Sequence, residues 1–168
     1  MLGGVRSGKS ALAEERALTL GGKNVLYVAT ALALPDDQDL LRRIEEHRER
    51  RHPDWDLLEL KGRDLDPVLE ASESRDAVLF DSLTLWVSAR MYGDGEEGTL
   101  EEFERFLGPA DELRAPVILV SDEVGLGIVP ESATERRFRD LLGLVNQRAA
   151  AAAEEVHLCF AGIAHRIK

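Results

Sequence analysis

The segment of residues 3–10, with the sequence G-G-V-R-S-G-K-S, restricts what this chain can fold into more than any other segment. It fits the pattern G-x-x-x-x-G-K-S/T, in which glycines let the backbone curl so that successive N–H groups point at phosphate oxygens. In such a loop the lysine, here Lys9, reaches the β- and γ-phosphates, and the hydroxyl of Ser10 binds Mg²⁺. A glycine-rich turn that contains Lys-Ser by chance is the alternative interpretation. The candidate phosphate-binding residues are Gly3, Gly4, Val5, Arg6, Ser7, Gly8, Lys9 and Ser10.

The residues after this loop support the phosphate interpretation, whereas the residues before it complicate it. Residues 11–20 are predicted to form a helix that Gly21 and Gly22 end, and the positive end of its dipole would face the same phosphates. The loop should also follow a buried strand, but only Met1 and Leu2 precede it, whereas a strand usually has about five residues. Either the central strand is unusually short or the true start lies upstream, and both explanations remain open.

Short apolar runs alternate with helical segments along the rest of the chain. We expect strands over residues 24–30, 55–60, 77–80, 116–120 and 156–161, and helices over 37–51, 65–72, 83–92, 100–113 and 133–155. Residues 93–98 are expected to form a flexible acidic loop. This alternation predicts an α/β fold of the P-loop NTPase type, RecA-like, with a mostly parallel sheet and helices on both faces. We expect a single domain over residues 1–168.

The composition argues against several classes of partner. The formal net charge of -11 argues against nucleic acid and anionic membranes, because those surfaces bind basic faces. No apolar stretch reaches the roughly 18 residues that span a membrane, and no charged, apolar leader opens the chain. The single cysteine, Cys159, can form no internal disulfide, which suits a reducing cytoplasm.

Three acidic residues, Asp81, Asp122 and Glu123, follow predicted strands. Ligands of open α/β sheets bind at the carboxyl ends of the strands, and an aspartate there commonly holds Mg²⁺ in phosphate-loop proteins. The alternative role for each is to cap the next helix. We expect Asp81 to be a site residue and Asp122 to be structural, whereas for Glu123 both roles remain open.

A histidine lies within the highly charged run R-I-E-E-H-R-E-R-R, residues 43–51. Such a histidine is usually a solvated surface side chain. Neutral imidazole is also a good nucleophile towards phosphorus, and flanking arginines can neutralise a triphosphate under attack. Both interpretations of His47 stay open on these residues alone. His52 is a weaker candidate, and His157 and His165 have no supporting context.

Seven segments spread over the chain match the motifs of one enzyme family. They are residues 3–14 (GGVRSGKSALAE), 26–30 (LYVAT), 43–48 (RIEEHR), 81–87 (DSLTLWV), 122–131 (DEVGLGIVPE), 138–150 (FRDLLGLVNQRAA) and 162–168 (GIAHRIK). On these segments the chain resembles the bifunctional adenosylcobinamide kinase/adenosylcobinamide-phosphate guanylyltransferases of cobalamin biosynthesis. The segment at 122–131, with F-R-D and V-N-Q after it, is far more specific than the phosphate loop.

The resemblance implies roles for individual residues. His47 corresponds to the histidine that GTP guanylylates, and residues 3–10 would hold the triphosphate. The family places nucleotide contacts at the positions of Thr30, Arg51, Glu59 and Asp81. Mg²⁺ would lie on Ser10 and Asp81. This chain departs from the family in its short first strand and in Arg51-His52, where the family usually has arginine and proline.

The resemblance also implies two successive reactions. In the kinase step the aminopropanol hydroxyl of adenosylcobinamide attacks the γ-phosphate of GTP or ATP, with Lys9 and Mg²⁺ stabilising the charge. In the transferase step His47 attacks the α-phosphate of GTP, and adenosylcobinamide phosphate then takes the GMP. The family is trimeric, so a homotrimer is expected. The alternatives are a monofunctional kinase of a small metabolite and a nucleotide-binding regulatory module.

Overall fold

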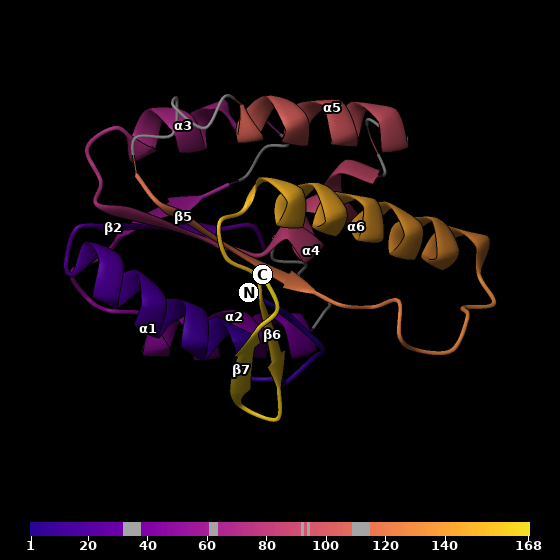
Figure 1. The fold of residues 1–168 in the computed structure, drawn as a ribbon, viewed down its shortest axis with the longest axis horizontal. Helices are drawn as coiled ribbons and strands as arrows, with labels where there is room; N and C mark the ends of the chain where they lie inside the picture. Colours follow the sequence, from indigo (N-terminus) through magenta and orange to yellow (C-terminus); the bar gives the residue numbers. More distant parts are fainter. Residues whose placement is uncertain (32–37, 61–63, 92, 94, 109–114) are drawn as a thin grey trace.

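The computed structural model describes residues 1–31, 38–60, 64–91, 93, 95–108 and 115–168. It is built around a seven-stranded sheet of strand order β3-β2-β4-β5-β1-β6-β7 (Figure 1). Neighbouring strands run parallel except for the antiparallel pair β6 and β7. The strands are β1 (Leu2–Gly3), β2 (Val25–Ala29), β3 (Asp56–Glu59), β4 (Ala77–Asp81), β5 (Val117–Asp122), β6 (His157–Phe160) and β7 (Ile163–Arg166).

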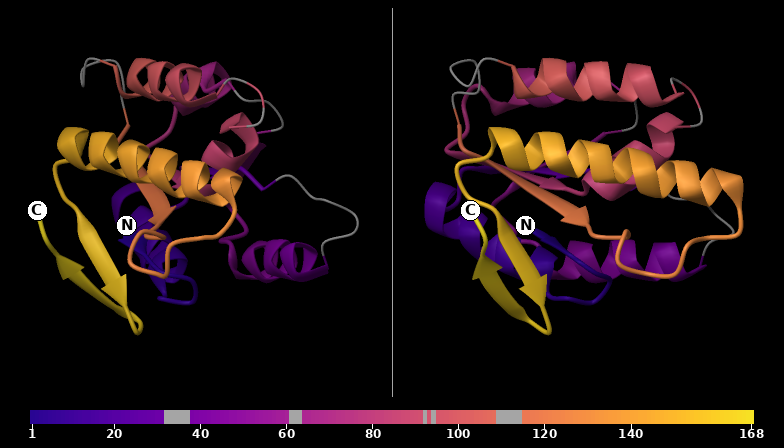
Figure 2. Two further views of the ribbon diagram at one scale, coloured as in Figure 1. Left: turned by 90° about the vertical axis from the view of Figure 1, so that its right-hand side faces the viewer. Right: turned by 45° about the vertical axis from the view of Figure 1, so that its right-hand side comes forward.

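Helices cover both faces of the sheet, as the alternating pattern predicts (Figures 1 and 2). They are α1 (Lys9–Gly21), α2 (Gln38–Arg50), α3 (Asp66–Ser72), α4 (Leu83–Met91), α5 (Gly95–Leu107) and α6 (Ala133–Ala152). The larger core lies beneath α3 to α6 and contains Trp86, Phe103 and Leu142. The smaller core lies beneath α1, where Ala13 and Ala17 pack against β2, β4 and β5. Among the described helices, no segment combines the length and the hydrophobicity that a membrane span requires.

The strands β2 and β4 are deeply buried neighbours within the sheet. Their first four residues, V-L-Y-V and A-V-L-F, are all buried, so the apolar side chains show no alternation between faces. This is the pattern of a parallel strand that helices cover on both sides. Because these two strands pair in parallel from Val25 with Ala77 to Ala29 with Asp81, their carboxyl ends meet at one edge.

Strand β1 is short but fully integrated into the sheet. Leu2 pairs with Ser121 of β5 and with Leu158 of β6. On the β5 side, the N–H of Ser121 donates to the carbonyl of Met1 over 3.0 Å, and the N–H of Glu123 donates to the carbonyl of Gly3 over 3.2 Å. The two neighbouring strands thus fix the start of the phosphate loop.

Three expectations about local structure are wrong. Residues 95–98 begin α5 instead of forming a flexible loop, because Glu96 and Glu97 in the first turn favour the positive end of a helix. The hydroxyl of Thr99 also donates to the carbonyl of Gly95 over 2.5 Å. The helix expected over 100–113 ends at Leu107 in the described chain, while 109–114 lie outside the described residues. Helix α6 ends at Ala152, three residues early.

The last strand, β7, has no counterpart among the sequence-based expectations. It folds back on β6 through Ala161 and Gly162, both of which have positive φ angles, 50° and 80°. Two residues of positive φ make the tight hairpin turn that follows strand twist best. Asn-Gly or Asp-Gly signals such a turn in a sequence, but Ala-Gly does not.

The tight contact between α1 and the sheet predicts opposite effects for two glycine substitutions. A Cβ atom on Gly21 would lie 2.8 Å from Val25 Cγ2 and 3.0 Å from the backbone nitrogen of Ala77. We expect Gly21→Ala to lower the free energy of unfolding by about 1–3 kcal/mol. Apart from the backbone of its own helix, Gly143 in α6 has no described atom within 4 Å of such a Cβ. Gly143→Ala should therefore raise the free energy of unfolding by about 0.5–1 kcal/mol.

Urea denaturation at one protein concentration measures the free energy of unfolding of both variants. Equal effects of the same sign would contradict the packing of α1 against β2 and β4.

Candidate active site

A cleft of about 430 Å³ lies at the carboxyl ends of β2 and β4, between the phosphate loop and α2. In open α/β sheets this is the edge where ligands bind. Of the residues expected at the site, ten line the cleft, namely Val5, Arg6, Ser7, Gly8, Lys9, Ser10, His47, Arg51, Glu59 and Asp81. Gly3, Gly4 and Thr30 lie outside the lining.

Close packing requires two glycines of the phosphate loop. A Cβ on Gly3 would lie 2.5 Å from the carbonyl oxygen of Cys159, and a Cβ on Gly8 would lie 3.0 Å from Gly162 Cα. Gly8 also has a φ of 89°, which favours glycine. The β6–β7 turn therefore packs directly against the phosphate loop. The N–H of Gly162 also donates to the carbonyl of Ser7 over 2.9 Å.

The loop contains an unsatisfied polar atom and the N-terminal end of α1. The buried hydroxyl oxygen of Ser7 has no hydrogen-bond partner among the described residues. Helix α1 begins at Lys9, one residue after the Gly8 N-cap, and no described side chain caps it. A buried hydroxyl and an uncapped helix N-terminus are groups that an anion can satisfy. These features fit a phosphate ligand.

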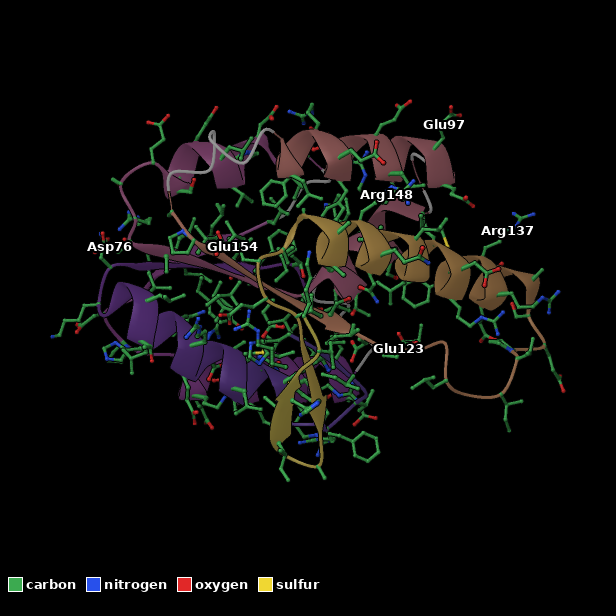
Figure 3. The ribbon with its side chains drawn as sticks, in the orientation of Figure 1. Asp76, Glu97, Glu123, Arg137, Arg148 and Glu154 are labelled. Atoms are coloured by element: carbon green, nitrogen blue, oxygen red, sulfur yellow. The ribbon has the colours of Figure 1, made fainter. Side chains whose placement is uncertain are left out.

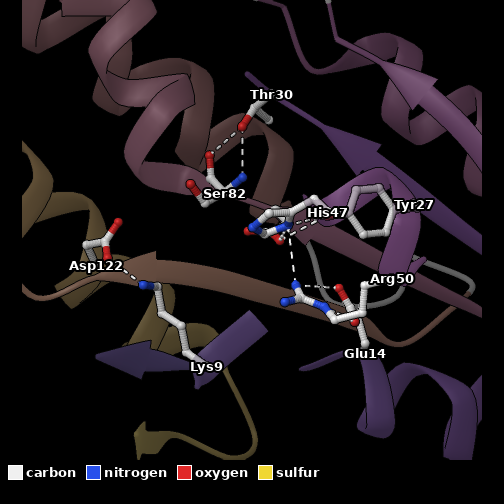
Figure 4. A network of polar contacts seen from close by, with 9 residues as sticks. Lys9, Glu14, Tyr27, Thr30, His47, Arg50, Ser82 and Asp122 are labelled. Atoms are coloured by element: carbon white, nitrogen blue, oxygen red, sulfur yellow. Dashed lines mark hydrogen bonds and ion pairs between the residues drawn. The ribbon is translucent and has the colours of Figure 1, made fainter. Parts of the chain in front are cut away.

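Lys9 folds back onto acceptors of the protein itself (Figure 4). Its Nζ donates to Asp122 Oδ1 over 2.5 Å and to the carbonyl of Gly4 over 3.3 Å. The backbone of Asp122 is fixed in turn, because its N–H donates to the Thr84 hydroxyl over 2.8 Å and its carbonyl accepts from Asn146 Nδ2 over 3.1 Å. A bound phosphate would compete with Asp122 for the lysine ammonium.

Asp122 differs from the sequence-based expectation, whereas Glu123, whose role was left open, lies outside the cleft lining. Asp122, expected to be structural, lines the cleft and contacts Lys9. Glu123 lies just beyond the end of β5 (Figure 3), where its carboxylate accepts from the N–H of Gly125 over 2.6 Å. The register of the sheet explains the difference, because Asp122 pairs directly with Gly3 at the start of the phosphate loop.

His47 lies in the cleft and is held there by two other side chains. Its Nδ1 atom lies 3.2 Å from Asp81 Oδ2 and 3.3 Å from the Tyr27 hydroxyl. The Tyr27 hydroxyl donates to the same carboxylate oxygen over 3.0 Å. The side chain of Asp81 is 8% exposed and that of His47 is 35% exposed. The structure therefore brings His47 to the carboxyl end of β4.

The electrostatics of this group favour an ionised Asp81. Burial alone raises the pKa of this carboxyl, but the hydrogen bonds from His47 and Tyr27 and the charge of Lys9 outweigh burial and hold the pKa below its usual value. Burial, together with the nearby charge of Asp81, raises the pKa of Tyr27 and keeps its hydroxyl protonated.

Polar bridges hold α2 over the phosphate loop, since no residue of this helix is fully buried. The guanidinium of Arg50 donates two hydrogen bonds to the carboxylate of Glu14 in α1, over 2.7 and 2.9 Å. The guanidinium of Arg51 lies over the Tyr27 ring, 5.4 Å from its centroid. Sequence reasoning assigned no role to Glu14 or Tyr27, and it expected Arg50 only as one of the arginines that flank His47. A tyrosine at the centre of an otherwise aliphatic strand was the available signal.

Thr30 lies outside the cleft and holds the backbone next to Asp81. Its hydroxyl donates to the carbonyl of Ser82 and accepts from the N–H of Ser82, both over 2.8 Å, directly after Asp81 (Figure 4). The residue is buried and does not line the cleft. Its side chain therefore fixes the backbone that carries Asp81.

This double hydrogen bond predicts a measurable loss of stability. Thr30→Val keeps the shape of the side chain but leaves the buried Ser82 N–H without its partner, so we expect a loss of about 1–3 kcal/mol in the free energy of unfolding. Thr19→Val is the matched control, because the exposed Thr19 hydroxyl only donates to the carbonyl of Glu15, and its effect should stay within about 0.5 kcal/mol. Equal values in chemical denaturation would contradict the supporting role of Thr30.

The remaining histidines lie outside the cleft lining. His52 stacks on Trp55 with ring centroids 5.8 Å apart, and His157 Nε2 lies 3.1 Å from the Glu155 carboxylate. His165 lies exposed on β7. Among the four histidines of the chain, His47 alone faces the phosphate loop across the cleft.

Comparison with known proteins identifies the family. The family model described as "Cobinamide kinase / cobinamide phosphate guanyltransferase" matches residues 1–167. The bifunctional adenosylcobalamin biosynthesis protein CobU of Escherichia coli is 38% identical over 180 residues, which cover 99% of this chain and 97% of that protein. Protein CobP of Pseudomonas aeruginosa, which has the same description, is 39% identical over 168 residues. These residues cover 100% of this chain and 95% of that protein. The resemblance in the motifs is confirmed, and the chain belongs to the cobinamide kinase / cobinamide phosphate guanyltransferase family.

Proposed function

We propose that this enzyme phosphorylates the aminopropanol hydroxyl of adenosylcobinamide and then transfers GMP from GTP, through His47, to give adenosylcobinamide-GDP. Family membership supports both activities. The observation that carries the proposal is that His47 and the phosphate loop line the same cleft. A triphosphate bound by the loop would thus share the cleft with the nucleophile.

For the kinase step, we propose that residues 3–10 position the nucleotide phosphates. Lys9 would leave Asp122 and donate to the β- and γ-phosphates, where negative charge develops. The Ser10 hydroxyl and the Asp81 carboxylate line the cleft and are hard oxygen ligands of the kind that Mg²⁺ prefers, so they would hold it. When bound, Mg²⁺ supplies charge neutralisation between the phosphates. Positioning and electrostatics provide most of the catalysis in such transfers.

For the transferase step, we propose that His47 is the nucleophile towards the α-phosphate of GTP. Arg43, Arg48 and Arg51 line the same cleft and would offset the charge of the triphosphate. Thr30, Arg51, Glu59 and Asp81 remain the proposed nucleotide-binding positions, with Thr30 acting through the backbone of Ser82.

We further propose a homotrimer. The loop after β5 exposes Leu126, Ile128 and Val129, of which Ile128 is 96% exposed. The strand ends on either side of the β6–β7 turn expose Phe160 and Ile163. Large apolar side chains that are this exposed are typical of contacts between proteins. Light scattering after gel filtration should give three times the chain mass of 18.6 kDa, and a mass of one chain would contradict the trimer.

The net charge of -11 supports small molecules and not nucleic acid as the ligands. The single cysteine, Cys159, has no disulfide partner, which supports a cytoplasmic enzyme.

Product analysis tests the proposed reactions. With adenosylcobinamide, Mg²⁺ and either ATP or GTP, we expect adenosylcobinamide phosphate first, followed by adenosylcobinamide-GDP and pyrophosphate when GTP is present. Phosphorylation without any GMP transfer would favour the monofunctional kinase. A rise in melting temperature with nucleotide but no product would favour the regulatory module. The comparison of ATP with GTP also shows which nucleotide donates the phosphoryl group in the first step.

A further inference from the structure

We propose that Asp81, supported by Tyr27, holds His47 with its proton on Nδ1, so that Nε2 is the atom that carries GMP. This inference rests on the proposed GMP transfer and names the reacting atom and the residues that select it. Asp81 and Tyr27 act here as positioning residues for the nucleophile.

Three polar groups surround Nδ1 of His47. Asp81 Oδ2 lies 3.2 Å away, the Tyr27 oxygen 3.3 Å away, and Arg50 Nη2 3.5 Å away (Figure 4). Either Nδ1 carries a proton and donates to the carboxylate, or it carries a lone pair and accepts from Tyr27 or Arg50. The other hydrogen bonds of these partners decide between the two arrangements.

Both potential donors make shorter hydrogen bonds to carboxylates than to His47. The Tyr27 hydroxyl has one proton, and it donates that proton to Asp81 Oδ2 over 3.0 Å. Arg50 donates to both carboxylate oxygens of Glu14 over 2.7 and 2.9 Å, which are much shorter contacts than its approach to His47. A lone pair on Nδ1 would also face the oxygen lone pairs of the buried Asp81 Oδ2 at 3.2 Å, which is repulsive. An Nδ1–H group donates to Asp81 Oδ2 and leaves the hydrogen bonds from Tyr27 to Asp81 and from Arg50 to Glu14 in place.

The protonated Nδ1 leaves Nε2 as the nucleophilic nitrogen of the neutral ring. No described residue contacts Nε2 within hydrogen-bond distance, and the ring is among the cleft-lining side chains. Figure 4 shows the ring between Tyr27 on one side and the end of Lys9 on the other. The free nitrogen is therefore available to a phosphate bound in the cleft.

The arrangement suits both halves of the transfer. The Nε2 lone pair forms a bond to the α-phosphorus while the bond from that phosphorus to the bridging oxygen breaks, and pyrophosphate leaves with the electron pair. Because Nδ1 keeps its proton, the substituted ring becomes a cation, which the Asp81 carboxylate stabilises. In the second half the phosphate oxygen of adenosylcobinamide phosphate attacks, and the N–P bond electrons return to Nε2 and neutralise the ring.

The group also explains how α2 can present a nucleophile without being buried. Tyr27 comes from β2 and Asp81 from β4, the two buried parallel strands, whereas His47 comes from a helix with no fully buried residue. The buried strands therefore fix the positions of Tyr27 and Asp81. The hydrogen bond between Asp81 and His47 then fixes the position of the imidazole ring.

Nuclear magnetic resonance of the guanylylated enzyme tests the proposal. Full-length protein labelled with ¹⁵N in its four histidines is treated with GTP, Mg²⁺ and pyrophosphatase, and the ring nitrogen that couples to ³¹P is identified. His47→Asn assigns the His47 signals by difference, and His165→Asn, which alters an exposed histidine on β7, is the matched control. We expect coupling to Nε2 in the adduct and the Nδ1–H tautomer in the resting enzyme.

The outcomes separate this inference from the proposed function. GMP attached to Nδ1 would overturn the inference while leaving the covalent transfer intact. A complete absence of adduct on a protein that binds GTP would overturn the transfer itself.

A Tyr27→Phe variant tests the supporting role of the tyrosine. Phenylalanine keeps the buried ring and removes only the hydroxyl that fixes Asp81. We expect guanylylation to slow roughly tenfold, the second ring tautomer to appear in the resting enzyme, and GMP to remain on Nε2. An unchanged tautomer and an unchanged rate would show that Tyr27 does not position Asp81.

Discussion

Replacing His47 with asparagine is expected to reduce GMP transfer at least about 10³-fold, because the proposed covalent route then has no nucleophile. Asparagine is the informative replacement, since its amide can still donate to Asp81 and so preserve the contact of α2 with the sheet. The measurement is the rate of pyrophosphate release from GTP in the presence of adenosylcobinamide phosphate. Nucleotide binding, followed by thermal shift, shows whether the cleft still forms.

The control for this prediction is His165→Asn, which changes an exposed histidine outside the cleft and should transfer GMP at the wild-type rate within about twofold. A His47→Asn enzyme that transfers GMP at more than a tenth of the wild-type rate would exclude a covalent intermediate on this residue. In that case direct attack of the second substrate on GTP would replace the two-step route.

Replacing Lys9 with methionine is expected to lower the rate constant of phosphorylation about 10²–10³-fold, because one preorganised donor to the transferred phosphoryl group is lost. Methionine has a similar length and keeps the apolar part of the side chain. The loss should appear at saturating nucleotide, since the charge on the phosphates grows in the transition state. The measurement is the rate of adenosylcobinamide phosphate formation over a series of donor concentrations.

Lys23→Met is the matched control, because Lys23 lies on the surface in an ion pair with Asp54. Its rate should stay within about twofold of the wild type. If Lys9→Met keeps more than a tenth of the wild-type rate at saturating nucleotide, the loop of residues 3–10 does not stabilise the transferred phosphate as proposed.

Local patterns were sufficient to predict most of the fold. The apolar runs around Tyr27 and Phe80 correctly indicated buried strands, since strands buried on both faces leave continuous apolar segments. Positions at strand ends were also predictable, because parallel strands bring their carboxyl ends to one edge, as Asp81 shows. The start of α5 at Gly95 was missed, since glycine and acidic residues read as a loop although they also suit a helix N-terminus.

The missed part of the site depends on long-range contacts. Tyr27 and Asp81 are separated by 54 positions and Lys9 and Asp122 by 113, so no local period or spacing links them. The role of Asp122 follows from the pairing of β5 with β1. The order of the strands within the sheet was not predicted from the sequence. Similarly, the attachment of α2 through Arg50 and Glu14 looked like an ordinary charged surface.

Intact-protein mass spectrometry after incubation with GTP and Mg²⁺ tests the central claim most directly. The account predicts a mass increase of one GMP, which is lost in acid, maps to the peptide that contains His47, and disappears on addition of adenosylcobinamide phosphate. An enzyme that binds GTP and phosphorylates adenosylcobinamide, but never gains GMP, would contradict transfer through His47.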